Sequence, residues 1–479
     1  MVFARRAEAA KLGGGNLSTF LEGHCRLRLT VKAMNRYLRG LVIFLLGVLT
    51  ASAISTAQEP KPYRLTLRDA IEKGLQANLS VLLADTRVGE AEGTRMRRLS
   101  AALFPRVRGQ SYANLQNRNL SAFGISFPGV PEVVGPFSNY DFRFYADQNL
   151  LDLQSYRTWK ASERALDASK MDYQDARDLI VRSIASLYLN AQAAAARADA
   201  AQSRVTASNA LYQLAKDKHD AGTATGVDLL RSQVQLANDK QALLAAQNQY
   251  KQALIALARN LGMSPGTPLE LAEPLRYQPL TRPQAESVLP AALLSRPDYL
   301  SLASQRQGLV EQQRASRARY YPKLSLNGNY GGLGRSIGGV QGTGVIQGQL
   351  DFTLFDRDRS GEAQELASRL KRVDDRIADL RHGIDEEIRE ALLNLESAAE
   401  QVAVAEEGQG LAQRELELTQ DRFQSGVTNN VEVVTAQDEL ARAQENYILA
   451  VSAHLDAKFA LARAVGGTEK DIGQYLGNP

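Results

Sequence analysis

The side chains that could carry out chemistry are few in this chain of 479 residues, and they are scattered. His219, His382 and His454 lie far apart, and no two of them have the spacing of metal ligands. The run at residues 331–344 (GGLGRSIGGVQGTG) has the composition of a phosphate-binding loop, but a strand-like pattern follows it where such a loop requires a helix. The sequence therefore predicts no catalytic residue, no cofactor site and no metal site, and a protein that is not an enzyme.

A different pattern recurs and suggests a contact site. Residues 217–230 (DKHDAGTATGVDLL) and 421–434 (DRFQSGVTNNVEVV) are similar at an offset of 204 positions. Each stretch joins two long helical patterns, so each is predicted to be the tip of a helical hairpin. Gly222 and Gly426 hold matching places and can adopt backbone conformations that other residues resist. An isolated glycine often does no more than end a helix, but the duplication favours contact with a partner here.

The residues around the two glycines are small or apolar, which suits packing against the helical hairpin of a partner. The predicted contact residues are Gly222, Thr223, Gly226, Val227, Leu229, Leu230, Gly426, Val427, Val431, Val433 and Val434. Asp228 and Glu432 stand at the start of the two return helices. An acid there complements the helix dipole, which is a sufficient structural reason for both.

Two long helices must carry these tips. No proline or glycine interrupts residues 155–219, and at about 1.5 Å per residue such a helix is about 100 Å long. A second uninterrupted pattern runs from near Gly361 to Gly426. Its apolar positions alternate in steps of four and three with one stutter, which indicates a coiled-coil seam. A two-helix coiled coil is the simpler alternative, but it does not explain the strands described next.

Each long helix follows a pair of predicted strands, at about 106–117 and 139–151 and again at about 323–331 and 344–355. Residues 139–147 (NYDFRFYAD) alternate between an aromatic face and a charged face. This alternation suits a membrane β-strand with lipid on one side and a wet lumen on the other. An ordinary amphipathic hairpin of a soluble protein is the alternative.

The sequence therefore predicts two copies of one structural unit, a strand pair followed by a long helical hairpin. Asp152 matches Asp356 at the offset of 204, whereas Pro105 matches Pro322 at an offset of 217, so the first strand pair has the longer loop. Helices are expected to stop at both prolines. The predicted organisation is a first repeat at 58–262, a proline-rich connector at 263–290, a second repeat at 291–466 and a short tail at 467–479.

Residues 1–57 are predicted to be an upstream extension followed by a secretory signal peptide that begins at Met34. Two arginines precede an apolar run at 41–49 that is too short to span a bilayer, and small residues follow it. Cleavage is expected after Ala53 or Ala57. A buried core helix is the alternative.

Removal of residues 1–57 changes the charge of the chain. It leaves 49 of the 57 basic and 51 of the 53 acidic residues, so bulk charge gives no reason to expect nucleic-acid binding. Cys25, the one cysteine, is lost as well, which suits an oxidising periplasm or cell exterior.

Four membrane strands cannot stand alone. A closed transmembrane barrel needs at least about eight strands, and open sheet edges cannot be left in lipid. The sequence therefore predicts an oligomer in which other copies complete the barrel, with the copy number left open.

The chain resembles the TolC-type outer-membrane efflux proteins. The resemblance rests on the two-fold repeat, the LTLRDAI opening at 65–71, the Phe-Pro and Tyr-Pro junctions, the QNLLD and FTLFD motifs ending at Asp152 and Asp356, and the paired tips. It implies a mainly α fold with membrane β-strands. Three copies would form a twelve-stranded outer-membrane β-barrel continuous with a periplasmic α-barrel of twelve helices. It also implies export from an inner-membrane transporter, with a periplasmic adaptor docked at the tips.

The resemblance also points to an entrance aperture, formed here by Asp228, Thr428, Glu432 and Thr435. Glu432 matches the first of two acidic positions of the family, but Thr435 replaces the second and Thr428 replaces a tip arginine. A cation-selective ring and an arginine-held closed state therefore do not carry over to this chain. A periplasmic adaptor or a structural coiled-coil protein is the alternative function, and the sequence leaves the exported substrate and the transporter class open.

Overall fold

The computed structural model describes residues 62–280 and 285–469. The predicted extension and signal peptide at 1–57, the connector residues 281–284 and the tail residues 470–479 lie outside the described residues. Among the helices that the structure describes, none combines the length and the hydropathy that a membrane span needs.

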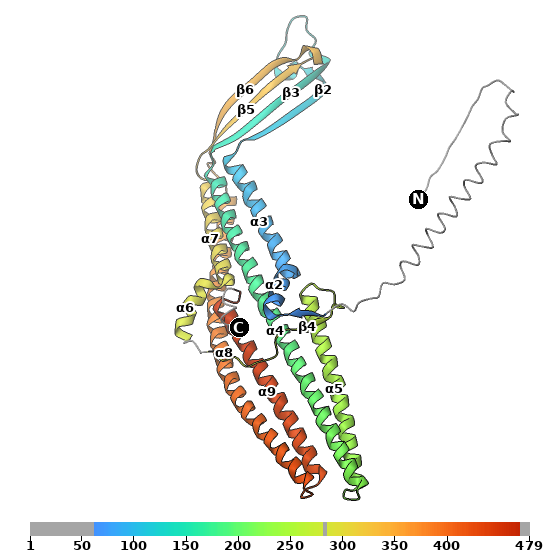
Figure 1. Ribbon diagram of the computed structural model, residues 1–479. Coiled ribbons are helices and arrows are strands. Elements are labelled where there is room, and N and C mark those ends of the chain that lie inside the picture. The colour runs from blue at the N-terminus through green and yellow to red at the C-terminus, as the bar shows by residue number, and fades with distance from the viewer. Residues whose placement is uncertain (1–61, 281–284, 470–479) are drawn as a thin grey trace, which may run out of the picture. The chain divides into compact units, whose positions relative to one another are not determined.

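The described elements follow the same order in both repeats (Figure 1). The first repeat contains β1 (Tyr63–Leu65), α2 (Leu67–Ala77), α3 (Leu79–Leu103), β2 (Arg106–Asn119), β3 (Val133–Leu151), α4 (Leu153–Asp220) and α5 (Gly226–Asn260). The matching elements of the second half are β4 (Leu269–Leu271), α6 (Ala285–Ser295), α7 (Pro297–Ala318), β5 (Lys323–Gly334), β6 (Gln341–Asp351), α8 (Asp358–Gln424) and α9 (Asn430–Val465). Of these, β4 and the start of α6 lie within the predicted connector at 263–290.

The helix before each strand pair is broken into two, at Asn78 and at Arg296. Asn78 ends α2 and caps α3, because its side chain accepts a hydrogen bond from the Ser80 backbone nitrogen at 2.9 Å. Arg296 separates α6 from α7, and Pro297 holds the first position of α7, where its missing N–H costs nothing. These breaks give a short helix, α2 or α6, before the longer helix α3 or α7.

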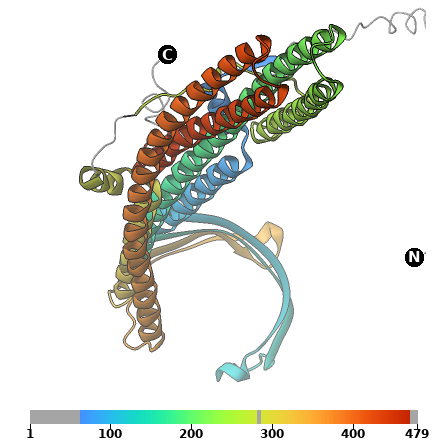
Figure 2. The ribbon, with the colours of Figure 1, turned by 90° about the horizontal axis from the view of Figure 1, so that it is seen from below.

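Strands β2, β3, β5 and β6 form one antiparallel sheet in that order. The register places Phe144 between Gly109 and Tyr330, and it places Arg143 between Gln110 and Gly331. Because alternate side chains of a strand point to opposite faces of the sheet, this register places the aromatic and aliphatic side chains on one face and the charged and amide side chains on the other. Figures 1 and 2 show the strands curving strongly away from the helices.

The last strand is shorter than the sequence suggested, because β6 ends at Asp351 and not at Phe355. Asp351 lies opposite Lys323, which is the first residue of β5. Beyond that pair the chain has no partner strand among the described residues, and Phe352, Leu354 and Phe355 are exposed.

The helices pack along their lengths around apolar seams. The largest apolar cluster joins α2 and α4 to the C-terminal part of α9, and it includes Ile71, Ile184, Tyr188 and Phe459. A second cluster joins α6, α8 and α9 through residues such as Ile384, Ile388 and Leu461. The paired helices α4–α5 and α8–α9 run away from the sheet and turn over at their far ends (Figure 1).

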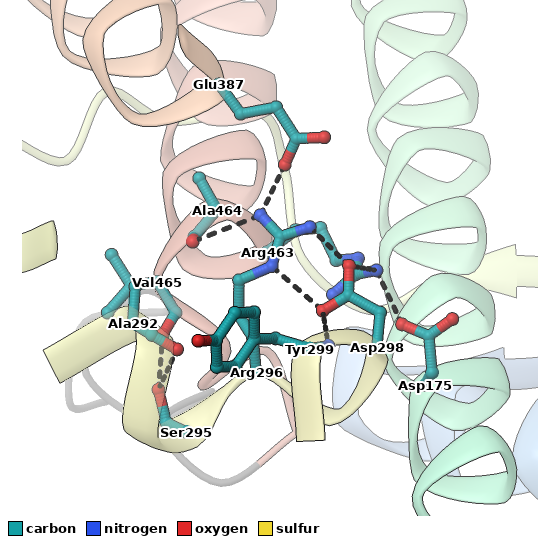
Figure 3. Close-up of polar contacts among 10 residues, drawn as sticks. All are labelled: Asp175, Ala292, Ser295, Arg296, Asp298, Tyr299, Glu387, Arg463, Ala464 and Val465. Carbon is teal, nitrogen blue, oxygen red and sulfur yellow. Dashed lines mark hydrogen bonds and ion pairs between the residues drawn. The ribbon is translucent and has the colours of Figure 1, made fainter. Parts of the chain in front are cut away.

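A group of charged residues around two buried arginines, Arg296 and Arg463, is called here the ionic junction and joins α4, α7, α8 and α9 (Figure 3). Arg296 is only 2% exposed, and its guanidinium contacts Asp298 at 2.6 Å and also Glu387. Arg463 contacts Asp175 at 2.5 Å. Burial is the largest single influence on the pKa of Asp298 and acts to raise it. The hydrogen bond from Arg296, the positive charges of Arg296 and Arg463 and the hydrogen bond from the Tyr299 nitrogen together outweigh burial and hold the pKa below its ordinary value.

Candidate functional site at the two hairpin tips

Both tips turn through a glycine in the left-handed region. Gly222 follows α4 with φ of +73°, and Gly426 follows α8 with φ of +76°. A Cβ built at either position would meet nothing within 4 Å. Glycine is therefore favoured at both turns by the backbone conformation and not by crowding, and the space beside each turn is open.

The return helices begin differently in the two repeats. Thr225 and Asp228 form a capping box at the start of α5: the Asp228 nitrogen donates to Thr225 Oγ1 at 3.2 Å, and the Thr225 hydroxyl donates to Asp228 Oδ2 at 2.6 Å. Asn429 caps α9, and Glu432 instead lies 3.8 Å from Arg422. The two matched acids therefore differ. The Asp228 side chain caps the start of its own helix, whereas the Glu432 side chain lies near Arg422 and takes no part in the cap of α9.

Most of the predicted contact residues form the outer surface of the tips. Val427 is 68% exposed, and the others in this group are also exposed; they are Gly222, Thr223, Gly226, Val227, Leu230, Gly426 and Val431. Leu229 and Val434 are half-buried. Apolar side chains thus remain open to a partner at both tips.

Val433 does not belong to that surface. It has no exposed area and packs with Leu211, Leu416, Phe423 and Ala436 in an apolar cluster between the two hairpins. Its inclusion among the contact residues was wrong, because Val433 lies on the face of α9 that packs against the other hairpin, whereas Val431 lies on an exposed face.

Two polar links join the tips, and the sequence interpretation missed both. The Lys218 ammonium donates to the backbone oxygens of Phe423 at 2.5 Å and Gln424 at 3.3 Å, and it lies 4.4 Å from the centroid of the Phe423 ring. The Asn430 amide donates to the Asp228 backbone oxygen at 3.1 Å. A lysine in the last turn of a helix is a usual capping group, so a search for basic residues next to the tips would have found Lys218.

The four predicted aperture residues occupy different environments within one chain. Glu432 and Thr435 are exposed, and Asp228 and Thr428 are half-buried. The Thr435 hydroxyl donates to the Val431 backbone oxygen at 3.0 Å, while Thr428 Oγ1 has no hydrogen-bond partner within the part of the chain that the structure describes. A single chain does not bring the four into one ring.

A buried polar layer distinguishes the first hairpin from the second. Asp239 on α5 is 1% exposed, and Arg204 and Ser208 on α4 both contact its carboxylate, with Arg204 Nη2 at 2.6 Å. The matching positions of the second hairpin are Gly408, Ala412 and Ala443. A buried polar group between two packed helices fixes their register. The first hairpin has such a group, and the second has small residues at the matching positions, which allow its helices to pack closely.

Across residues 62–280 and 285–469, no group of three or more His, Cys, Asp or Glu side chains is placed to hold a metal ion. The exposed apolar side chains of the tips can contact a partner, and the polar links of Lys218 and Asn430 hold the two tips of one chain together.

Comparison with protein families identifies the fold and its class. The chain matches the family described as outer membrane efflux protein over residues 70–263 and 288–467. It is 24% identical over 414 residues to the probable efflux pump outer membrane protein TtgC of Pseudomonas putida, covering 84% of this chain and 83% of TtgC. It is 26% identical over 323 residues to the pyoverdine export outer membrane protein OpmQ of Pseudomonas aeruginosa, covering 64% of this chain and 66% of OpmQ.

Solved structures share the fold at low sequence identity. The CmeC outer membrane channel of Campylobacter jejuni superposes with a TM-score of 0.73 at 17% identity, covering 88% of this chain and 93% of CmeC. The MtrE outer membrane channel of Neisseria gonorrhoeae gives 0.70 at 18% identity, covering 84% and 89%. The predicted fold class, a duplicated strand pair with long helical hairpins, is confirmed.

Proposed function

Because the chain belongs to the outer membrane efflux protein family, we propose that it is the outer-membrane conduit of a tripartite export system. Three copies form a twelve-stranded barrel in the outer membrane and a tunnel of twelve helices in the periplasm. The tips dock on a periplasmic adaptor, and an inner-membrane transporter supplies the substrate.

The observation that carries this proposal is the division of the sheet into two faces. Phe142 and Phe144 point to one side and are exposed, while Asp141 and Arg143 point to the other and pair with each other, with Arg143 Nε 2.7 Å from Asp141 Oδ1. An apolar outer band and a polar interior are what a transmembrane β-strand requires. A sheet of this kind attached to helices of 67 and 68 residues fits a membrane anchor for a long tunnel.

The edges of the sheet support assembly with further copies. β2 and β6 are the outer strands of the four, so each leaves one row of backbone groups without a strand partner in the described residues. Lipid offers no hydrogen bonds to such groups, and closure of the barrel is the way to satisfy them. Four strands from each of three copies make a barrel of twelve, which lies within the range of closed membrane barrels.

The exposed apolar residues of the tips support docking there. Val227, Leu230, Val427 and Val431 are exposed beside two open glycine turns. Apolar groups without a covering neighbour are typical of surfaces that bind another protein. The occupant that fits the proposed system is a helical hairpin of the adaptor.

Site-directed crosslinking in intact cells tests this function. A photo-crosslinking residue at Val427 or Val227 is expected to capture the adaptor in protein that fractionates with the outer membrane. A matched control at Val404, which is equally exposed on α8 but far from the tips, is expected not to capture it. Recovery of the protein as a soluble periplasmic monomer, or capture from Val404 alone, would contradict the proposal.

A further inference from the structure

The face of the sheet that carries the charged and amide side chains, called here the polar face, differs between the two strand pairs. On the first pair, Arg108 lies opposite Tyr145, and Tyr112 lies opposite Asp141. Arg143 shares their face, because it lies two positions from both Asp141 and Tyr145 on β3. These five residues are called here the tyrosine-arginine sector. The matching positions of β5 and β6 are uncharged: Ser325, Asn329, Val345, Gln347 and Gln349.

Asp141 holds the Arg143 side chain in place on this face. Arg143 Nε donates to Asp141 Oδ1 at 2.7 Å, and Nη2 donates to the other carboxylate oxygen. Gly331 lies opposite Arg143 on β5 and makes room for its stem, because a Cβ there would lie 2.7 Å from Arg143 Cγ. Asp141 is only 1% exposed, so its carboxylate presents almost no surface of its own. The Nη1 nitrogen of Arg143 takes no part in this pair.

Two guanidinium groups lie beside the ring of Tyr145. The guanidinium carbon of Arg108 is 5.5 Å from the ring centroid, and that of Arg143 is 5.6 Å from it. A cation at such a distance is attracted to the ring. Arg108 also lies 3.4 Å from Asp147, but both side chains of this pair are exposed, so the ion pair contributes little. Arg108 can therefore turn towards another anion at low cost.

We infer that the tyrosine-arginine sector is a binding site for aromatic anions that pass through the lumen. The anionic group of such a cargo accepts hydrogen bonds from Arg108 and from Arg143 Nη1. Its ring stacks on a guanidinium plane and contacts the Tyr145 ring. This inference rests on the proposed function, because it takes the polar face as the inner wall of a channel.

The position of the site suits a cargo that must leave again. A ligand on the wall of a lumen is contacted from one side and stays in water on the other, so binding is weak. Conduction requires that a site be favourable enough to enter and weak enough to leave. In the proposed trimer, three such sectors alternate around the lumen with three sectors that bear amide and small side chains. The site is therefore repeated once in each copy.

Three small probes of similar size test the site by their block of the current through purified protein in a planar bilayer. Benzoate has both the charge and the ring, benzamide lacks the charge, and cyclohexanecarboxylate lacks the aromatic ring. Benzoate is expected to block at a concentration about tenfold lower than benzamide, because a charge-assisted hydrogen bond contributes about that factor. It is expected to block at a concentration roughly threefold lower than cyclohexanecarboxylate, because the aromatic contact is weaker.

A double variant gives the first strand pair the residues that the second pair has at the same places. Arg108→Ser with Tyr145→Gln is expected to block equally with benzoate and benzamide. Arg143 is left unchanged, because its removal would leave the buried Asp141 charge without a partner. The matched control is Gln349→Ala, on the same face of the second strand pair, and it is expected to keep the wild-type preference for benzoate.

The outcomes separate the site from the proposed function. If the protein forms channels and the three probes block it equally, or if the double variant keeps the wild-type preference, the binding site is wrong and the proposed function stands. Block by cyclohexanecarboxylate as strong as block by benzoate would contradict the selection of aromatic anions. A protein that forms no channel in the bilayer overturns the proposed function and the binding site together.

Discussion

Asp178 on α4 is only 6% exposed, and its carboxylate accepts a hydrogen bond from the Glu469 backbone nitrogen at 3.2 Å. Burial raises the pKa of Asp178 from 3.8 to about 6, although nearby Arg463 acts in the opposite direction. The folded chain therefore binds this proton more tightly than the unfolded chain does. The stability that this group contributes is present in full below pH 3.8 and is lost as the pH rises through about 6.

Asp178→Asn keeps an oxygen that can accept the Glu469 hydrogen bond but removes the charge. We expect this variant to be more stable than wild type at pH 7.5, by at most about 3 kcal/mol, because that is the free energy corresponding to the raised pKa. The difference is expected to vanish at pH 4, as measured by the unfolding midpoint of the detergent-solubilised protein. Asp172→Asn, an exposed site on the same helix, is the control. An equal gain at both pH values would contradict this account.

At the scale of elements, the sequence predicted the long helices and the two strand pairs well because their periodicities are long and uninterrupted. The breaks at Asn78 and Arg296 depend on local capping and proline chemistry, and the sequence interpretation did not include them. It placed a boundary less well where a distant segment decides it. Strand β6 ends at Asp351 because its neighbour β5 begins at the opposite residue, Lys323. No local pattern around residue 351 carries that information.

The repeat predicts which strand continues the sheet beyond β6. Within the chain, β3 pairs with β5 so that Tyr145 lies opposite Asn329. Tyr145 matches Gln349 on β6 at the offset of 204, and Asn329 matches Tyr112 on β2 at the offset of 217. The repeat therefore predicts that Gln349 of one copy lies opposite Tyr112 of the neighbouring copy. In this register, residues 352–355 gain a partner strand, and the apolar and polar faces of the two copies stay aligned.

Cysteine pairs across this boundary test the register. Gln349→Cys with Tyr112→Cys is expected to form disulfides between copies, because β2 and β6 are separated by two strands within one chain and cannot reach each other there. Gln349→Cys with Gln110→Cys is the matched control, shifted by two residues on the same face. Stronger crosslinking by the shifted pair would show that the register between copies differs from the register within one.

At the scale of the whole molecule, the duplication was readable from the sequence, because glycine, proline and aspartate positions recur at fixed offsets. The contacts between the two hairpins were not. Whether Val433 faces outward, and whether Lys218 reaches Phe423, depends on how one hairpin packs on the other. Residues far apart in the sequence make these contacts, and each local pattern is compatible with several packings.

The copy number is the central claim, because the barrel, the tunnel and the mouth all depend on it. Native mass spectrometry of the protein extracted from outer membranes in detergent measures it most directly. We expect three times the mass of the processed chain, since three copies supply twelve strands and leave no sheet edge in lipid. The mass of a single chain, or of any number of copies other than three, would contradict the account.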